Sequence, residues 1–316
     1  LERGRAMSKV REVFTVTGRV RADRLGVILP HEHVLVDFIG ADRVSRSRYD
    51  PEEVYRVVLP YLQRLRKAGC RTLVECTPAY LGRDPQLLQR LSKASGIYLL
   101  TNTGWYGAAN DKYLPARAFD LSAEQIASEW IAEAQQGIEG TGIRPGFTKI
   151  GVDPEPSEVD MRLLEAAALT HRKTGLTIAS HTGPGSAARK QIERLEQLGV
   201  RPSAFIWVHA QLEGDKGLHV WAAERGAWVE FDGVAPDTVD QHVELILHLR
   251  QKGLLGRVLV SHDAGWYHVG EPGGGTFREY TTLFTHLLPA LRRAGFSDGE
   301  IEQLVAENPQ RALAGG

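Results

Sequence analysis

The 316-residue sequence has very few cysteines and no long hydrophobic run. Only Cys70 and Cys76 are present, and the stretch between them reads as a strand that would separate the thiols by about 20 Å, too far for a disulfide. No apolar stretch approaches the roughly 18 residues of a membrane-spanning helix, and the first residues lack the hydrophobic segment of a signal peptide. We therefore expect a cytoplasmic protein with two buried free thiols and no membrane partner.

The sequence also lacks an excess of charge of either sign. Its 38 lysine and arginine residues nearly cancel its 39 aspartate and glutamate residues, and no segment concentrates basic residues as a nucleic-acid-binding surface would. Apolar residues (42%) and charged residues (24%) occur at the frequencies of ordinary globular proteins. We expect no nucleic-acid partner, a flexible segment at residues 1–12 and a single domain over residues 13–316.

Short apolar runs alternate with amphipathic stretches along the chain. The apolar runs suit strands buried on both faces and comprise residues 25–36, 71–76, 97–102, 146–150, 176–180, 204–208, 227–231 and 257–260. The stretches between them carry apolar residues three and four positions apart, as amphipathic helices do, and comprise residues 51–68, 84–94, 122–138, 157–173, 186–198, 215–224, 238–252 and 278–294.

Eight such alternations predict an α/β fold of the (β/α)8 TIM barrel type. The alternative is an open doubly wound sheet, but no Gly-x-Gly-x-x-Gly motif follows the first strand. Two segments fall outside the repeat. Residues 14–20 are expected to form a strand of a short N-terminal β-hairpin, and residues 297–306 an extra C-terminal helix that ends ahead of Asn308-Pro309.

A His-x-His pair closes the first apolar run. In an extended strand residues two apart face the same way, so His31 and His33 can reach one point while Glu32 turns away. Neutral imidazole is the commonest side-chain ligand of zinc-like ions. The pair alone is weak evidence, because a histidine in a fold is more often a hydrogen-bonded structural residue.

Further residues of the ligand type lie at the carboxyl ends of later strands. They are Lys149, His181, His209 and Asp263, with His262 as a competitor of Asp263 for the inward position. Barrel active sites are assembled at this end, so the candidates should converge. A buried ammonium without a partner is costly, and burial favours the neutral amine. That amine can add carbon dioxide, and the resulting carbamate could bridge two cations roughly 3.5 to 4 Å apart.

These motifs together resemble the phosphotriesterase-like family of the amidohydrolase superfamily. The resemblance runs from Thr17-Gly18 to Asn308-Pro309 and rests on residues 29–33, 137–142, 146–150, 180–182, 208–209 and 261–263. It implies one divalent ion on His31, His33 and Asp263, a second on His181 and His209, and the carbamate of Lys149 with a hydroxide between them. It also implies that Asp263 is the general base. Zinc is the favoured ion, and cobalt, manganese or iron would also suit these ligands.

The substrate pocket is expected beside these ligands, at Trp105, Tyr106, Trp266, Tyr267 and His268. Tyr106 resembles the tyrosine that lactonases of this group direct at the metal-bound oxygen, where its phenol could donate to a developing oxyanion; an aromatic wall is the alternative. The glycine-rich loop 270–275 is expected to be a mobile lid. The other histidines are expected at the surface, and these are His171, His219, His242, His248 and His286.

We therefore expect a hydrolase in which a metal-bridging hydroxide attacks a lactone or ester carbonyl, with side activity toward phosphotriesters. Phosphotriester hydrolysis as the main activity and a non-catalytic metal-containing binding protein are the alternatives. The resemblance also implies a homodimer. Two departures from the family put a proton relay in question. Gly233 stands where many relatives carry Arg or His, and residues 210–215 replace a run of aspartates.

Overall fold

A short antiparallel hairpin lies near the start of the part of the chain that the computed structural model describes, residues 11–315. Its strands are β1 (Glu12–Thr15) and β2 (Gly18–Arg21). The single strand expected over residues 14–20 is therefore wrong, because Val16 and Thr17 form the turn between the two strands. The predicted flexible segment falls outside the described residues except for its last two, and Glu12 already belongs to β1.

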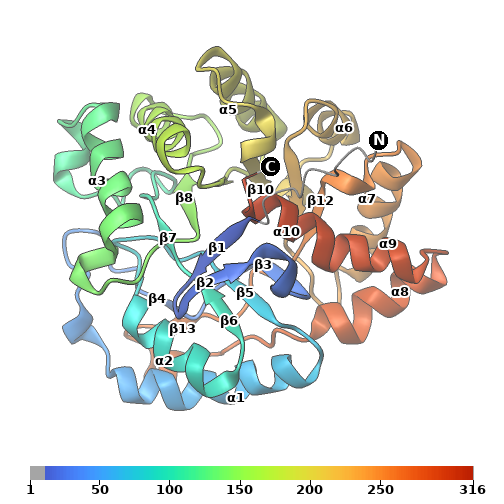
Figure 1. The fold of residues 1–316 in the computed structure, drawn as a ribbon, viewed down its shortest axis with the longest axis horizontal. Coiled ribbons are helices and arrows are strands. Elements are labelled where there is room, and N and C mark those ends of the chain that lie inside the picture. Colours follow the sequence, from blue (N-terminus) through green and yellow to red (C-terminus); the bar gives the residue numbers. More distant parts are fainter. Residues whose placement is uncertain (1–10, 316) are drawn as a thin grey trace, which may run out of the picture.

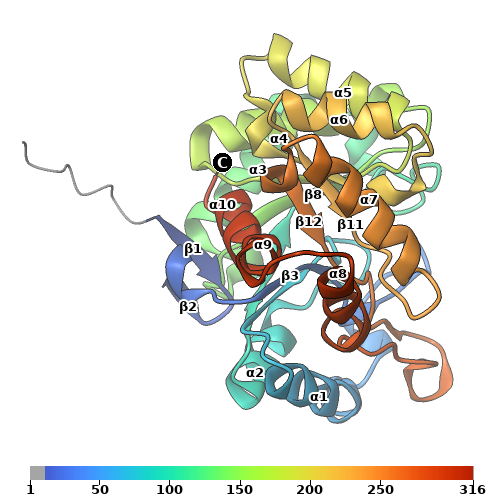
Figure 2. The same ribbon diagram turned by 90° about the vertical axis from the view of Figure 1, so that its right-hand side faces the viewer.

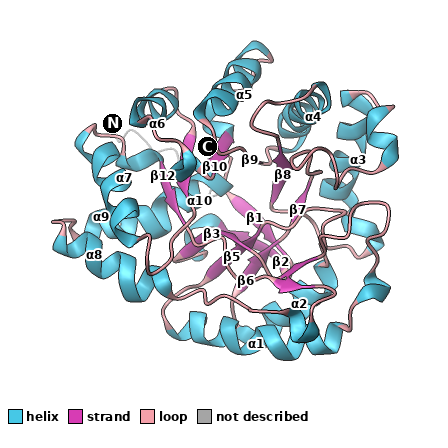
Figure 3. Ribbon diagram, turned by 180° about the vertical axis from the view of Figure 1, so that it is seen from behind, coloured by secondary structure: helices cyan, strands magenta, loops and turns pink. Residues whose placement is uncertain are grey.

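Parallel strands are arranged as a (β/α)8 barrel, with the helices outside them (Figures 1 and 3). The strands are β3 (Ile28–Glu32), β5 (Thr72–Glu75), β6 (Tyr98–Leu100) continued by β7 (Asn102–Thr103), β8 (Phe147–Gly151), β9 (Ile178–His181), β10 (Phe205–Val208), β11 (Trp228–Phe231) and β12 (Val258–Val260). Hydrogen-bonded neighbours run β3-β5-β6 and β7 through β12 in order. At the remaining junction the backbone N–H of Asp263 donates to the carbonyl of His31 over 3.1 Å, which links the last strand position to the first.

The outer helices begin and end close to the predicted positions. They are α1 (Pro51–Lys67), α2 (Pro85–Ser95), α3 (Ala123–Gln136), α4 (Glu158–Thr174), α5 (Gly185–Gln197), α6 (Lys216–Glu224), α7 (Val239–Gln251) and α8 (Leu288–Arg293). Ser122 caps α3 in a capping box with Gln125, as the sequence predicts. Gly96 ends α2 in the left-handed conformation, which glycine adopts without steric cost.

The last part of the chain departs from the predicted helices. Residues 278–281 are not part of a regular helix, and a π-helical turn, Leu283–Leu287, precedes α8. The predicted final helix does not stop before Asn308-Pro309. It continues as α9 (Asp298–Glu302), a second π-helical turn and α10 (Asn308–Leu313). Pro309 is the second residue of α10, shortly after the π-helical turn Gln303–Glu307.

The interior of the barrel is apolar at the amino ends of the strands. Each strand position contributes at least one buried side chain to one cluster, namely Ile28, Val74, Leu100, Phe147, Ala179, Ile206, Trp228 and Leu259, and Cys76 and Val208 also belong to it. The hairpin and α10 lie at this end (Figure 2), and they add Val13, Ala312 and Leu313 to the cluster. Polar side chains at the next inward positions therefore lie toward the carboxyl ends of the strands.

Several other expectations can be compared with the structure. Cys70 and Cys76 are both buried and free. The expectation that the remaining histidines lie at the surface is wrong for His219 and His242, which are 1% and 0% exposed because they lie on the inner faces of α6 and α7 and bond to backbone carbonyls. Within residues 11–315, none of the helices combines the length and the apolarity needed to cross a bilayer.

Candidate metal centre

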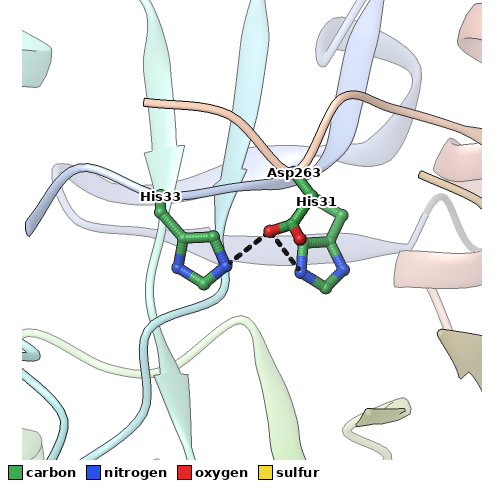
Figure 4. Close-up of side chains that lie close together, drawn as sticks. All are labelled: His31, His33 and Asp263. Carbon is green, nitrogen blue, oxygen red and sulfur yellow. Dashed lines mark ion pairs between the residues drawn. The ribbon is translucent and has the colours of Figure 1, made fainter. Parts of the chain in front are cut away.

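His31, His33 and Asp263 meet at the carboxyl end of the barrel (Figure 4). Oδ1 of Asp263 lies 3.0 Å from Nε2 of His33 and 3.5 Å from Nε2 of His31. The two imidazoles are almost fully buried, whereas the Asp263 side chain is 27% exposed. The three side chains therefore bring one ligand atom each to a single point that opens toward the mouth.

A bulge in β3 aims the two histidines into the barrel. Ile28 belongs to the interior cluster and Leu29 to the outer one, so strict alternation would turn Glu32 inward. The pairing of β3 with β5 shifts register between Leu29 and Glu32, and an extra residue in a strand reverses the faces beyond it. His31 and His33 consequently face the interior, and Glu32 turns away as expected.

Glu32 fixes the turn that carries Asp263. Its Oε1 accepts hydrogen bonds from the hydroxyl of Ser261, the backbone N–H of His262 and Nδ1 of His262, and its Oε2 accepts one from the backbone N–H of Ala264. His262 is held away from the other ligands by this contact and by the backbone N–H of Leu283, which donates to its Nε2. Asp263 takes the inward position with φ of 53°, a strained conformation of the kind that collects at functional sites.

His181 and His209 form a second pair beside the first. Nδ1 of His181 lies 2.9 Å from Nε2 of His209, so both rings present a nitrogen to the same point. His209 follows β10 with φ of 62°, and this left-handed turn brings its ring within 5.1 Å of the ring of His31, centroid to centroid. Burial lowers the pKa of His181 well below its usual range, which keeps this imidazole neutral.

Lys149 lies between the two histidine pairs in sequence and projects from the middle of β8. Its side chain is almost fully buried, and its Nζ lies 5.5 Å from the ring centroid of Tyr106. Burial lowers the pKa of Lys149 against the opposing effects of Asp263 and other nearby acids. A lowered pKa increases the share of neutral amine, the form that can react with carbon dioxide.

Two carboxyl groups hold the Nδ1 atoms of the histidines, and the sequence analysis missed both. They belong to Glu230 on β11 and to Asp232, which directly follows this strand. Oε1 of Glu230 lies 2.9 Å from Nδ1 of His31, and Oδ1 of Asp232 lies 2.7 Å from Nδ1 of His209. Thr77 plays the same part for His33, with Oγ1 2.7 Å from Nδ1. The signal was present in the alternation Glu230-Phe231-Asp232 at the carboxyl end of a predicted strand, which places both acids on one face.

The protonation of these groups follows from their contacts. Burial lowers the pKa of His31 to about 3, so His31 is neutral at pH 7. Burial raises the pKa of Glu230 well above its usual range, with a further contribution from Asp232. Burial would also raise the pKa of Asp232, but His209 and His31 together hold it far below its usual range. Asp232 is therefore ionised and stabilises hydrogen on Nδ1 of His209.

The residues present fit a divalent metal ion. Oδ1 of Asp263 is buried yet has no hydrogen bond of correct geometry among the described residues, although two imidazole nitrogens lie within 3.5 Å. Two imidazoles and a carboxylate around one point are a common zinc-type donor set, and His31, His33 and Asp263 are close enough to hold one ion. His31, His209 and Asp232 are equally close, but hydrogen bonds through the Nδ1 atoms explain that group.

The predicted pocket residues separate into two sets. Trp266 stacks on His33 with ring centroids 3.9 Å apart, and its Nε1 donates to the carbonyl of Asp263 over 2.7 Å. The ring of Tyr106 packs edge-on against His181 at 5.0 Å, and burial raises the pKa of its phenol, so the hydroxyl stays protonated at pH 7. His268 lies farther out, 6.2 Å from Trp266. Trp266 and Tyr106 therefore contact the predicted ligands directly, whereas the ring of His268 packs near Trp266 and Phe38.

Trp105 and Tyr267 point elsewhere. Trp105 packs against Tyr80 and Trp130 in a separate cavity of about 530 Å³ between α3 and the loops that follow the first three strand positions. Tyr267 belongs to β13 (Tyr267–His268), which pairs with β4 (Leu35–Val36). Burial and a hydrogen bond with Glu53 raise the pKa of Tyr267 to about 12. Because Glu53 belongs to α1, the phenol of Tyr267 lies at α1 rather than at the metal ligands.

Comparison with known proteins identifies the family. The model of the phosphotriesterase family matches residues 11–313. The chain belongs to the phosphotriesterase family. This phosphotriesterase-family chain is 29% identical over 294 residues to the phosphotriesterase homology protein of Escherichia coli strain K12, covering 92% of this chain and 98% of that protein.

Other family relatives carry names that denote hydrolases. The chain is 26% identical over 307 residues to an aryldialkylphosphatase of Saccharolobus solfataricus, covering 92% of this chain and 96% of that protein. Its structure is also similar to that of a PTE-like lactonase mutant from Deinococcus radiodurans, with a TM-score of 0.86, 28% identity and coverage of 95% and 99% of the two chains. The resemblance to this family is therefore confirmed, and so is the barrel fold.

The departure at Gly233 has a structural counterpart in Gln211. The side chain of Gln211 donates to Oδ1 of Asp232 and accepts from the backbone N–H of Asp232. A side chain at position 233 would meet Nε2 of Gln211 at 2.9 Å, so the absence of a side chain there leaves room for this contact. Gln211 and Gly233 together hold Asp232 in place, and neither can relay a proton at neutral pH.

Proposed function

We propose that this chain is a hydrolase with two divalent metal ions that opens a lactone or carboxylic ester, with weaker activity toward phosphotriesters. The observation that carries the proposal is the set of buried imidazoles around the unpaired Oδ1 of Asp263. One ion would be held by His31, His33 and Asp263, and the other by His181 and His209. The carbamate of Lys149 would bridge the two. Zinc is our first choice, with cobalt, manganese or iron as alternatives.

Two divalent ions would supply a nucleophile that is deprotonated at neutral pH and a Lewis acid for the substrate oxygen. The protein's own groups provide the rest. Asp263 is the most exposed of the three residues in Figure 4, and its carboxylate can accept the proton released during attack. Burial opposes ionisation of Asp263, but His33 and His31 lower its pKa to about 2. The carboxylate is therefore ionised at pH 7 and can act as a base.

Tyr106 favours a carbonyl substrate. Its protonated phenol lies beside His181 and Lys149, where it can donate a hydrogen bond to oxygen that gains negative charge as a carbonyl is attacked. Trp266 covers His33 and excludes water from that side. These contacts support a lactone or ester, with an apolar group lying along the aromatic side chains.

Phosphotriester hydrolysis is the second candidate for the main activity. It is favoured by the similarity to an aryldialkylphosphatase and by the presence of the same donors at the mouth. A non-catalytic metal-binding role is the third candidate. A homodimer and a cytoplasmic location remain predictions from the sequence.

A substrate panel tests these candidates. Protein loaded with zinc or cobalt would be assayed against γ- and δ-lactones, aryl esters and a paraoxon-type phosphotriester, with chelator-stripped protein as the control. We expect lactones to give the highest kcat/KM and the stripped protein to be inactive. A higher kcat/KM for the phosphotriester would favour the second candidate. Loaded protein that is inert across the panel would contradict hydrolysis.

A further inference from the structure

Two buried acids stand side by side beneath the histidines, although a single acid would be enough to orient His209. Glu230 and Asp232 are 1% and 0% exposed, and both project into the barrel from β11 because they are two residues apart on one strand. A buried carboxyl group is costly unless it is fully hydrogen-bonded. The second acid therefore needs its own explanation.

Asp232 is engaged mainly by His209 and Gln211. Its Oδ1 accepts from Nδ1 of His209 at 2.7 Å and from the amide of Gln211 at 2.8 Å, and its Oδ2 accepts from the backbone N–H of His209 at 3.0 Å. The distance from Oδ2 to Nδ1 of His31 is 3.4 Å, at the limit of a useful hydrogen bond. Oε1 of Glu230, at 2.9 Å, is the atom that can hold Nδ1 of His31.

We infer that Glu230 is a positioning residue for the metal centre, which fixes the ring and tautomer of His31, and that with Asp232 it ties the two metal positions to one strand. The inference rests on the proposed metal centre. A hydrogen on Nδ1 that is bonded to Glu230 leaves Nε2 as the ligand atom, directed at Oδ1 of Asp263. Asp232 does the same for His209 in the other pair. A displacement of β11 would thus move one ligand of each ion together.

Metal competition tests the inference. Glu230→Leu removes the acceptor and keeps an apolar side chain of similar length, and Glu230→Gln keeps an amide oxygen that can accept from Nδ1. Asp160→Asn is the matched control, because Asp160 is a buried acid that bonds to the backbone N–H groups of Asp153 and Ser157 and touches no ligand. Each folded variant would be titrated with zinc against a chromophoric chelator, and its metal content measured by mass spectrometry.

We expect Glu230→Leu to weaken the binding of at least one ion by about 10- to 100-fold, the usual cost of losing a partner of a metal-ligating histidine. Glu230→Gln should stay within about threefold of the wild type, and Asp160→Asn should match it. Equal zinc affinity in Glu230→Leu and the wild type would overturn the inference while leaving the proposed function intact. A wild-type protein that binds no ion would instead contradict the proposed function.

Proton NMR gives a second readout, which needs neither metal nor activity. The hydrogen on Nδ1 of His31 should give a low-field imidazole resonance in the metal-free protein, assigned by its loss in His31→Asn. We expect the signal to persist in Glu230→Gln. If Glu230→Leu does not fold, this signal and the zinc affinity of Glu230→Gln still decide the matter. A Gln variant that loses the signal but keeps wild-type zinc affinity would contradict an orienting hydrogen bond.

Discussion

The metal centre and the Trp105 cavity lie at the same end of the barrel, and both contain buried charged side chains, but they are built differently. In the cavity each cation has an anion beside it. Arg83, which is 2% exposed, lies 2.7 Å from Glu133 and 3.4 Å from Glu139, and Arg46 and Arg117 pair with Glu139 and Glu129. In the metal centre the imidazoles and Asp263 surround a common point and leave Oδ1 without a hydrogen bond.

This difference indicates a structural role for the charges of the cavity and a binding role for the side chains of the metal centre. Ion pairs between opposite charges connect loops and helices, as the pair of Arg83 and Glu133 connects the loop after β5 with α3. The ligand atoms of His31, His33 and Asp263 converge on one point, and a bound cation would give all three a partner. Buried atoms without a hydrogen bond occur in the cavity too, at Nε of Arg83 and Nε1 of Trp130, so a site is recognised by ligand atoms of several side chains that converge on one point. The following variants test this distinction, from the largest expected effect to the smallest.

Lys149→Ala should have the largest effect on activity. Loss of the bridging group would lower kcat/KM for the best lactone by about 10³-fold or more, because two-ion catalysis depends on the spacing of the ions. Metal content should fall below two equivalents. A short-chain carboxylic acid in the assay should restore part of the activity by occupying the vacated space. Normal turnover by Lys149→Ala would show that the lysine does not bridge the ions.

Arg83→Met should affect stability and leave the metal centre intact. Removal of one partner of a buried ion pair leaves Glu133 uncompensated and costs about 3 to 5 kcal/mol of unfolding free energy. Chemical denaturation measures that loss, and mass spectrometry should still find wild-type metal content. Glu133→Gln added to Arg83→Met should recover part of the stability. A loss of metal in the folded Arg83→Met protein would contradict a purely structural role of the cavity's ion pairs.

Tyr106→Phe should have an intermediate effect on activity. The variant keeps the ring against His181 and removes only the hydroxyl, so we expect kcat for lactones to fall about tenfold or more as one oxyanion donor is lost. The KM should change little. Circular dichroism and metal content serve as controls. An unchanged kcat would leave Tyr106 as an aromatic wall, the alternative that the sequence also allowed.

Trp105→Phe should have the smallest effect. Trp105 was expected in the substrate pocket, yet its ring packs against Tyr80 and Trp130. We expect kcat/KM to stay within about twofold of the wild type, with a loss of roughly 1 kcal/mol in stability from reduced packing. A tenfold change in KM for any substrate in the panel would show that the cavity communicates with the metal centre.

The sequence was sufficient for the barrel and for the convergence of the candidate ligands. Alternating apolar runs located the strands, and the candidate ligands lie near the carboxyl half of the barrel: Lys149 in the middle of β8, His181 at the end of β9 and Asp263 in the loop after β12. Local patterns could not supply the rest. The bulge in β3 depends on pairing with β5, and the helix runs through Pro309 after a π-helical turn that the sequence pattern does not announce. The role of Glu230 depends on the fold as well, because the barrel brings its side chain to His31 of β3 although β11 and β3 are not neighbouring strands.

The pocket residues show a similar limit. Trp105 and Tyr106 are neighbours in sequence, so they face opposite ways, and periodicity could not decide which one faces the ligands. Tyr267 is turned toward α1 by the pairing of β13 with β4, a contact between segments more than 200 residues apart. Adjacent aromatic residues were therefore grouped in one pocket, although the fold separates them.

An anomalous-scattering map of crystals of the zinc-loaded protein tests the central claim most directly. We predict two peaks at the mouth of the barrel, one beside His31, His33 and Asp263 and the other beside His181 and His209, with extra density on Nζ of Lys149 between them. A map without peaks there, around an unmodified lysine, would contradict the account.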